Sequence, residues 1–138
     1  MPYLLDTVTL SEFRKGRKAH PGVTKWQEGI GETWLSVITL HEMHYGMRKV
    51  ERKDPAFAAI LADWYRNVLN HSRRFRVLIV DRVISEQAAD FRAAFGTPLP
   101  DSLIAATVKV HNLTLATRNT ADFKACGIDL VNPWEFPA

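Results

Sequence analysis

The sequence lacks the features that mark several common classes of protein. It has one cysteine, Cys126, so no disulfide can form within the chain, and the sequence suits a reducing compartment. No uncharged apolar stretch approaches the roughly 18 residues of a membrane helix, and the first residues show no secretory signal pattern. Gly-rich phosphate loops of the dinucleotide-binding and Walker types are also absent. We therefore expect a soluble, cytoplasmic protein with no membrane segment.

Length and charge set the next limits. The 138 residues are 46% hydrophobic, which is enough for one core, so we expect a single domain over residues 1–138. The 18 Lys and Arg residues against 15 Asp and Glu give a formal net charge of +3. The basic residues gather in three runs, at 14–18, 48–53 and 73–76. Such clusters favour an anionic partner, although each run alone is also compatible with a solvated face or loop.

Apolar runs alternate with helix-like segments along the chain. Strands are predicted at 3–5, 34–38, 77–80, 113–117 and 128–131. Helices are predicted in 7–18, where a basic loop broken by Gly16 and Pro21 follows, and at 40–51, 54–70, 82–95, 101–111 and 121–125. The continuous run at 77–80 is typical of a strand that is buried on both faces. The alternation predicts an α/β fold, with a short parallel sheet of four to five strands flanked by helices.

Four carboxylates, Asp6, Glu42, Asp101 and Asp122, stand just past or near apolar runs, each at the start of a helical segment. Ligands of open parallel sheets bind at the carboxyl ends of the strands, so we expect these residues to converge in one acidic pocket. Crowded carboxylates repel each other unless a cation neutralises them, and oxygen donors without a Cys or His cluster favour Mg²⁺ or Mn²⁺. A metal-activated water would then attack a phosphodiester, with the basic runs holding the phosphate backbone.

Each carboxylate also has a purely structural alternative. The segment Thr39–Glu42 fits a capping box, and Asp101 after a proline fits a helix N-cap. Asp122 follows the potential cap Asn119 and would lie in a first helical turn, where the helix dipole favours negative charge. No single one of these acids favours a functional site over a structural role. Their joint occurrence after several strands does.

Two competing motifs fail on spacing. His41 and His44 are three residues apart in a His-Glu-Met-His segment, whereas the zinc motif H-E-x-x-H needs four, so surface or core histidines are the better interpretation. A phosphate-transfer motif of the haloacid-dehalogenase type would need a second Asp two residues after Asp6, where the chain has Val8.

Five segments, in this order, resemble a known family. They are LLDTVTLSE at 4–12, LSVITLHEMHYG at 35–46, PDSLIAATV at 100–108, LTLATRNTADF at 113–123 and VNPWE at 131–135. The chain resembles PIN-domain ribonucleases of the VapC type, which are toxins of bacterial toxin–antitoxin pairs. The resemblance runs almost end to end. It implies a PIN-like three-layer fold and a Mg²⁺- or Mn²⁺-dependent endoribonuclease, the toxin of a type II system, that hydrolyses RNA phosphodiester bonds in an acidic pocket.

The resemblance also assigns roles to the acidic residues. Asp6, Glu42 and Asp101 fall on the three main acidic positions of the family and are the expected metal ligands, with Asp6 and Asp101 as the direct ones. The fourth position has two candidates in this chain. Some relatives carry an acid where this chain has Asn119, and others carry it a turn later, where this chain has Asp122.

Other residues are expected to support the site. Thr7 and Thr117 would supply hydroxyl groups, with Thr117 near the metal, and Arg118 would be either structural or substrate-facing. The family usually shows Asn where this chain has Val8, so a polar contact that supports the site is lost. Because of Val8 and Asn119, the alternative function is a catalytically weakened PIN-like module that binds RNA or a protein.

The resemblance implies a homodimer that is inhibited by a small antitoxin, which wraps helical grooves and places a basic side chain in the acidic pocket. The segment 54–70 offers a candidate groove. Its apolar residues follow helical spacing and include several aromatic rings. Core packing accounts for such a stripe by default, but we predict that part of it, including Trp64 or Tyr65, stays open for a partner helix.

Overall fold

Five short strands form one parallel sheet in the part of the chain that the computed structural model describes, residues 2–138. The order across the sheet is β3-β2-β1-β4-β5. The strands are β1 (Tyr3–Leu5), β2 (Thr33–Ser36), β3 (Phe75–Leu78), β4 (Thr114–Ala116) and β5 (Asp129–Val131). The predicted α/β fold with a parallel sheet is confirmed.

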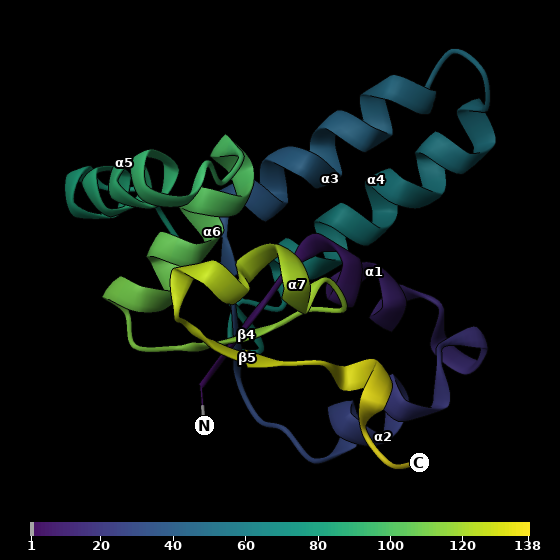
Figure 1. The fold of residues 1–138 in the computed structure, drawn as a ribbon. Coiled ribbons are helices and arrows are strands. Elements are labelled where there is room, and N and C mark those ends of the chain that lie inside the picture. Colours follow the sequence, from purple (N-terminus) through teal and green to yellow (C-terminus); the bar gives the residue numbers. More distant parts are fainter. Residues whose placement is uncertain (1) are drawn as a thin grey trace.

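Helices cover both faces of this sheet (Figure 1). They are α1 (Thr7–Arg14), α2 (Pro21–Glu28), α3 (Val37–Val50), α4 (Pro55–Asn70), α5 (Arg82–Phe95), α6 (Leu99–Val110) and α7 (Thr120–Phe123). Short 3₁₀ turns lie at Gly16–Lys18, Lys124–Cys126 and Pro133–Glu135. Figure 1 shows α3 and α4 side by side as a hairpin that extends away from the sheet. Within residues 2–138, no helix is long and apolar enough to cross a membrane.

The side chains of the central strands alternate between two hydrophobic cores. Leu4 and Leu115 are buried against α5 and α6, while Leu5 and Ala116, the next residues along, are buried against α1, α2, α3 and α4. This is the period of two that a strand imposes on its side chains. Cys126 packs into the first core, as a small apolar residue would. The result is a three-layer arrangement of helices, sheet and helices.

The strand order creates a crevice at a defined place. The chain builds β1, β2 and β3 outward in one direction, and then returns to place β4 on the other side of β1. Ligands of doubly wound sheets bind at the carboxyl ends of the strands where the winding reverses. Here that point lies between the end of β1, followed by Asp6, and the end of β4, followed by Thr117.

The boundary between β2 and α3 differs from the prediction. Residues 37 and 38 are helical instead of extended, because the side-chain oxygen of Ser36 accepts a hydrogen bond from the backbone N–H of Ile38 at 3.0 Å. Ser36 is therefore the N-cap of α3. Thr39 lies inside the helix and is fully buried, so the capping box predicted for Thr39–Glu42 is wrong. Glu42 is thereby free of a capping role.

Two further helix starts were predicted wrongly. The helix α6 begins at Leu99 after Pro98, so Asp101 lies in its first turn and is not the N-cap. The helix α2 was not predicted, because the sequence predicts a basic loop broken by Gly16 and Pro21 in this part of the chain. Its start follows the preference for proline in the first turn, at Pro21, and the His20 ring accepts a hydrogen bond from the backbone N–H of Gly22 at 3.1 Å.

The strand β3 is not buried on both faces. It is the edge strand and pairs only with β2, and it spans Phe75–Leu78 instead of residues 77–80. Val77 and Ile79 are 37% and 69% exposed. Only Val77 and Leu78 of the predicted strand lie in β3, and residues 79 and 80 follow it outside any strand. The place of β3 in the sheet depends on the connections of the whole chain, which the local sequence does not encode.

Candidate active site

A pocket of about 120 Å³ opens where β1 and β4 end, and it contains all four predicted carboxylates. Its lining residues are Asp6, Thr7, Val8, Glu42, Asp101, Ile104, Asn119, Asp122 and Phe123. The structure therefore brings together residues that lie on four separate segments of the sequence. None of the residues that line it is a lysine or an arginine, so within the described chain the pocket is acidic and unneutralised.

Asp6 is the most firmly held of these carboxylates. It is the N-cap of α1, where its Oδ1 accepts a hydrogen bond from the backbone N–H of Thr9 at 2.8 Å. Its Oδ2 accepts from the hydroxyl of Thr117 at 2.5 Å, which ties it to the end of β4. Burial raises the pKa of Asp6 above its ordinary value, and the hydrogen bonds from Thr117 and Thr9 oppose that rise.

Glu42 and Asp101 face Asp6 from two other helices. The Thr7 hydroxyl donates to Glu42 Oε1 at 3.1 Å, which connects the first turn of α1 to α3. Partial burial raises the pKa of Glu42, and the charges of Asp101 and Asp6 raise it further. The pKa of Asp101 is also raised by partial burial, and then by the charges of Asp122 and Asp6. All four carboxylates thus take part in one set of unfavourable charge interactions.

The residues fit a divalent metal ion by their chemistry. Within residues 2–138, no group of three or more Asp, Glu, His or Cys side chains is already arranged to hold a metal ion. The pocket nevertheless offers only hard oxygen donors among its charged groups, and partial burial, then mutual repulsion, raises the pKa values of Glu42 and Asp101. A cation of the Mg²⁺ or Mn²⁺ type would relieve that repulsion and is the kind of ion that carboxylate oxygens select.

The comparison with known proteins identifies the family. A model of the PIN domain matches residues 3–127 of this chain. The chain belongs to the PIN-domain family. The VapC ribonuclease Y4jK of Sinorhizobium fredii is 31% identical over 96% of this chain and 97% of the relative. The toxin FitB of Neisseria gonorrhoeae is 31% identical over 95% of this chain and 97% of the relative. The resemblance seen in the sequence motifs is confirmed.

A solved structure shares the fold. The crystal structure of FitAcB from Neisseria gonorrhoeae superimposes with a TM-score of 0.73 at 30% sequence identity, and the match covers 97% of this chain and 99% of the other. The PIN-like three-layer architecture predicted from the sequence is therefore confirmed.

The supporting residues of this PIN domain occupy different places. Thr117 is fully buried, and its hydroxyl both donates to Asp6 and accepts from the backbone N–H of Asn119 at 3.0 Å. Asn119 and Asp122 both line the pocket, and the charge of Asp122 acts on Asp101. Arg118 lies outside the pocket lining, with its guanidinium 5.5 Å from the ring centroid of Trp134, which favours the structural alternative for it.

Sequence reasoning missed one residue that shapes the site. Thr9 is fully buried: its backbone N–H binds Asp6, and its hydroxyl donates to the carbonyl oxygen of Ala116 at 2.8 Å. It therefore fixes both the Asp6 carboxylate and the distance between β4 and α1. The spacing of an Asp N-cap and a Thr three residues later was the available signal.

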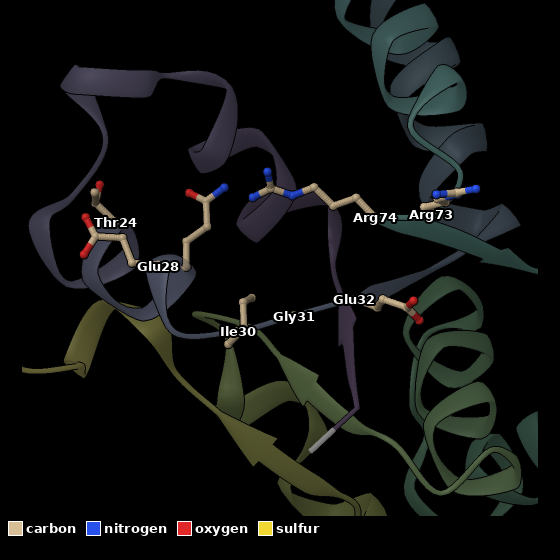
Figure 2. A pocket seen from close by; sticks show the side chains of 8 residues that line it. Thr24, Glu28, Ile30, Gly31, Glu32, Arg73 and Arg74 are labelled. Carbon is tan, nitrogen blue, oxygen red and sulfur yellow. The ribbon is translucent and has the colours of Figure 1, made fainter.

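A second, larger cavity lies at the other end of the sheet from the carboxylates. It has a volume of about 640 Å³ and lies between the end of α2 and the residues that precede β2 and β3. Figure 2 shows Thr24 and Glu28 on one side of it and Arg73 and Glu32 on the other. Size alone would favour this cavity, but its acids and arginines balance each other, and no group of carboxylates converges there. The smaller pocket remains the candidate active site.

Proposed function

We propose that this PIN domain is a metal-dependent endoribonuclease that acts as the toxin of a toxin–antitoxin pair in the cytoplasm. The convergence of four carboxylates in one pocket at the reversal point of the sheet carries the proposal. The similarity of the chain to a VapC ribonuclease and to a toxin supports it. The basic runs suit a polyanionic substrate such as RNA.

The metal ligands in this proposal are Asp6, Asp101 and Glu42, with Asp122 at the fourth acidic position. When bound, Mg²⁺ or Mn²⁺ supplies an activated water and stabilises the charge that develops on the phosphodiester. The chain itself supplies the positioning. Thr117 and Thr9 fix both oxygens of Asp6, while Thr7 holds Glu42 at the rim. Fixed ligands of this kind lower the cost of assembling a metal site.

Metal-dependent cleavage of RNA by the purified chain tests this function. The proposal expects cleavage in Mg²⁺ or Mn²⁺ that stops when a chelator is added. The alternative, a weakened PIN-like module, expects RNA or protein binding without cleavage under the same conditions. Cleavage that persists in excess chelator would contradict a metal-dependent site.

Replacement of Val8 by Asn should increase activity. Val8 lines the acidic pocket and is 41% exposed, so an amide there would meet solvent and would not be buried without a partner. A new polar contact to the metal ligands should raise metal affinity or the cleavage rate by up to about tenfold. The measurement is the cleavage rate as a function of Mn²⁺ concentration.

The chain offers a matched control for this change. Val83 is the second residue of α5, as Val8 is of α1, and each helix has an Asp N-cap that binds the third residue of the helix. Val83 is 51% exposed and lies outside the pocket. The Val83→Asn variant should cleave RNA at the wild-type rate. If the Val8→Asn variant cleaves RNA no faster than this control, then the absence of the Asn that the family usually has at position 8 does not limit the cleavage rate.

We also propose a cognate antitoxin as a partner, docked along α4. A cavity of about 240 Å³ lies on the Trp64 side of this helix, and its apolar wall includes Phe13 and Val68. Arg14 and Arg74 also line it, so an amphipathic helix that carries acidic residues would match both its shape and its charge. Similarity to a solved toxin–antitoxin complex from Klebsiella pneumoniae, at 26% identity and a TM-score of 0.69 over 97% of this chain and 99% of the other, supports this kind of partner.

A homodimer is part of the same proposal. Phe95 at the end of α5 and Leu99 at the start of α6 are 52% and 50% exposed. Apolar exposure of this extent near one pair of packed helices is typical of a surface that a second copy covers. Sedimentation of the purified chain at several concentrations tests the stoichiometry.

Removal of the Trp64 side chain should weaken antitoxin binding by about tenfold, because buried aromatic anchors dominate such interfaces. The ring is half-buried, and the guanidinium of Arg14 lies 5.6 Å from its centroid. Trp64→Ala should keep its helical circular dichroism and its RNase activity. The control is Leu69→Ala, which removes a 41% exposed residue of the same helix that does not line the cavity. Loss of the fold would place Trp64 in the core, and unchanged binding would place the antitoxin groove elsewhere.

A further inference from the structure

A groove along α3 lies beside the acidic pocket and has a different lining. Its volume is about 430 Å³, and five polar or aromatic side chains contribute to its lining: His41, His44, Tyr45, Arg48 and Tyr65. We call it the α3 groove. The first four residues come from one face of α3, at the helical spacings of three, four and seven, and Tyr65 comes from α4.

The α3 groove is next to the metal-binding carboxylates. Glu42 lines the acidic pocket, and the preceding residue, His41, lines the groove. The two are close enough for His41 to act on the Glu42 carboxylate electrostatically. A helix rises about 1.5 Å per residue, so Tyr45 and Arg48 lie about 4.5 Å and 9 Å further along the axis than Glu42. A ligand that extends from the pocket along α3 would enter the groove at once.

Positive charge increases toward the far end of α3. In Figure 1 this end is the tip of the projecting hairpin. Lys49, Arg52 and Lys53 form no ion pair with any described residue, while Arg48 pairs with Glu51 at 3.2 Å. All four basic side chains are exposed. The groove therefore connects an acidic pocket to a basic tip along one helix.

Tyr45 is the most informative residue of the groove. It is 60% exposed, although large aromatic side chains usually bury most of their surface. The Lys49 ammonium lies over the Tyr45 ring, 5.9 Å from its centroid, so a cation lies against one face of the ring. Across the groove, the His44 and Tyr65 rings meet edge to face at 5.9 Å. Exposed rings interleaved with cations are the arrangement that binds single-stranded nucleic acid, with bases on the rings and phosphates on the cations.

We propose that the α3 groove binds the single-stranded RNA next to the scissile phosphate, with Tyr45 stacked on a base and Arg48 and Lys49 holding phosphates. The proposal rests on the proposed ribonuclease function and adds the path of the substrate. An acidic antitoxin helix is the competing occupant. The observations favour RNA, because the groove continues from the carboxylates that would cleave it and because Arg48 and Lys49 lie beside the exposed ring of Tyr45.

The test measures binding of a fluorescent single-stranded RNA pool of random sequence by anisotropy, in an Asp6→Asn background in which cleavage is blocked. Loss of one stacking contact by Tyr45→Ala should weaken binding by about tenfold, and Tyr45→Phe, which keeps the ring, should restore it. Tyr45→Leu, which keeps apolar volume without a π face, should bind as poorly as Tyr45→Ala. Lys49→Gln should lower the slope of log affinity against log salt by about 0.7 for the lost phosphate contact.

Ile60→Ala is the matched control, because Ile60 is 56% exposed on the neighbouring helix and does not line the groove. It should bind RNA like the Asp6→Asn parent. Equal binding by Tyr45→Leu and the parent would overturn the stacking role. Loss of antitoxin affinity with unchanged RNA affinity would assign the groove to the antitoxin. If the wild-type chain cleaves RNA and all Tyr45 variants bind RNA normally, only the role of the α3 groove is contradicted. If the wild-type chain neither binds nor cleaves RNA, the proposed function is contradicted as well.

Discussion

Asp6→Asn and Asp101→Asn are each expected to lower metal-dependent RNA cleavage by about 100-fold or more, because each removes a charged oxygen ligand from the proposed metal site. The fold should survive. Asn is as good an N-cap as Asp, so the amide oxygen at position 6 can still accept from the backbone N–H of Thr9. Its amide NH₂ can donate to the Thr117 hydroxyl, which then acts as acceptor.

The same variants should be more stable than the wild type in the absence of metal. The pKa values of Asp6, Glu42 and Asp101 are raised in the folded protein, so folding favours their protonated forms. Their contribution to stability is complete below the pKa of the unfolded chain and is lost as the pH rises through the raised, folded pKa. At neutral pH the metal-free protein therefore carries carboxylates that are penalised by burial and, at Glu42 and Asp101, also by charge repulsion, and a neutral amide relieves this penalty.

The measurement combines a cleavage assay with thermal unfolding in chelator, and Asp90→Asn is the control. Asp90 is an exposed residue of α5 outside the pocket, so the identical chemical change there should alter neither quantity. Full RNase activity in both pocket variants, after removal of trace nuclease, would exclude these residues as metal ligands. A lower melting temperature than that of Asp90→Asn would show that their charges stabilise the fold instead.

The second large effect is expected for Thr117→Val. The Thr117 hydroxyl is fully buried and bridges Asp6 and the backbone N–H of Asn119. Without it, the Asn119 N–H loses its partner and Asp6 loses one of its hydrogen bonds, which should cost about 1–3 kcal/mol of the free energy of unfolding. The pKa of Asp6 should rise further, because the hydrogen bond that opposes its burial is gone. Because Asp6 is then held less well as a metal ligand, metal-dependent cleavage should fall by about 10- to 100-fold.

Thr107→Val separates this role from the general effect of deleting a buried hydroxyl. Thr107 is also fully buried, but its hydroxyl donates to the carbonyl oxygen of Leu103 in the same helix at 2.7 Å. This control should cleave RNA at nearly the wild-type rate with the same apparent metal affinity. If both variants lose activity in proportion to their loss of stability, Thr117 is a core residue and does not position Asp6.

Topology accounts for part of the convergence of the carboxylates, because Asp6 directly follows β1 and Asp122 lies in the helix after β4, at the carboxyl edge of the sheet. Glu42 and Asp101 reach the same pocket from within α3 and from the first turn of α6. The way each acid is held was not predictable in the same way. The hydrogen bond between Thr117 and Asp6 joins residues 111 positions apart, and its geometry depends on the pairing of β1 with β4.

The helix boundaries were predicted wrongly for a different reason. At the start of α3, the sequence predicts a strand that continues to residue 38 and a capping box at Thr39–Glu42, whereas the cap is Ser36. Both side chains are fully buried, so burial does not separate them. Ser36 ends β2 with an extended backbone and accepts from the N–H of Ile38, whereas Thr39 already lies inside the helix. The same limit applies to β3, since the apolar run at 77–80 predicts a buried central strand, whereas the strand is Phe75–Leu78 and lies at the edge. Local patterns identified these elements, and tertiary contacts fixed their ends and places.

Calorimetric titration of Mn²⁺ into the purified chain tests the proposed metal site most directly, because it reports on the pocket without depending on an RNA target. We predict saturable binding to the wild type and to Asp90→Asn, strongly weakened binding to Asp6→Asn and Asp101→Asn, and a rise in melting temperature with Mn²⁺ only where binding occurs. Equal Mn²⁺ binding by wild type, Asp6→Asn and Asp101→Asn would contradict the claim that these carboxylates form a metal site.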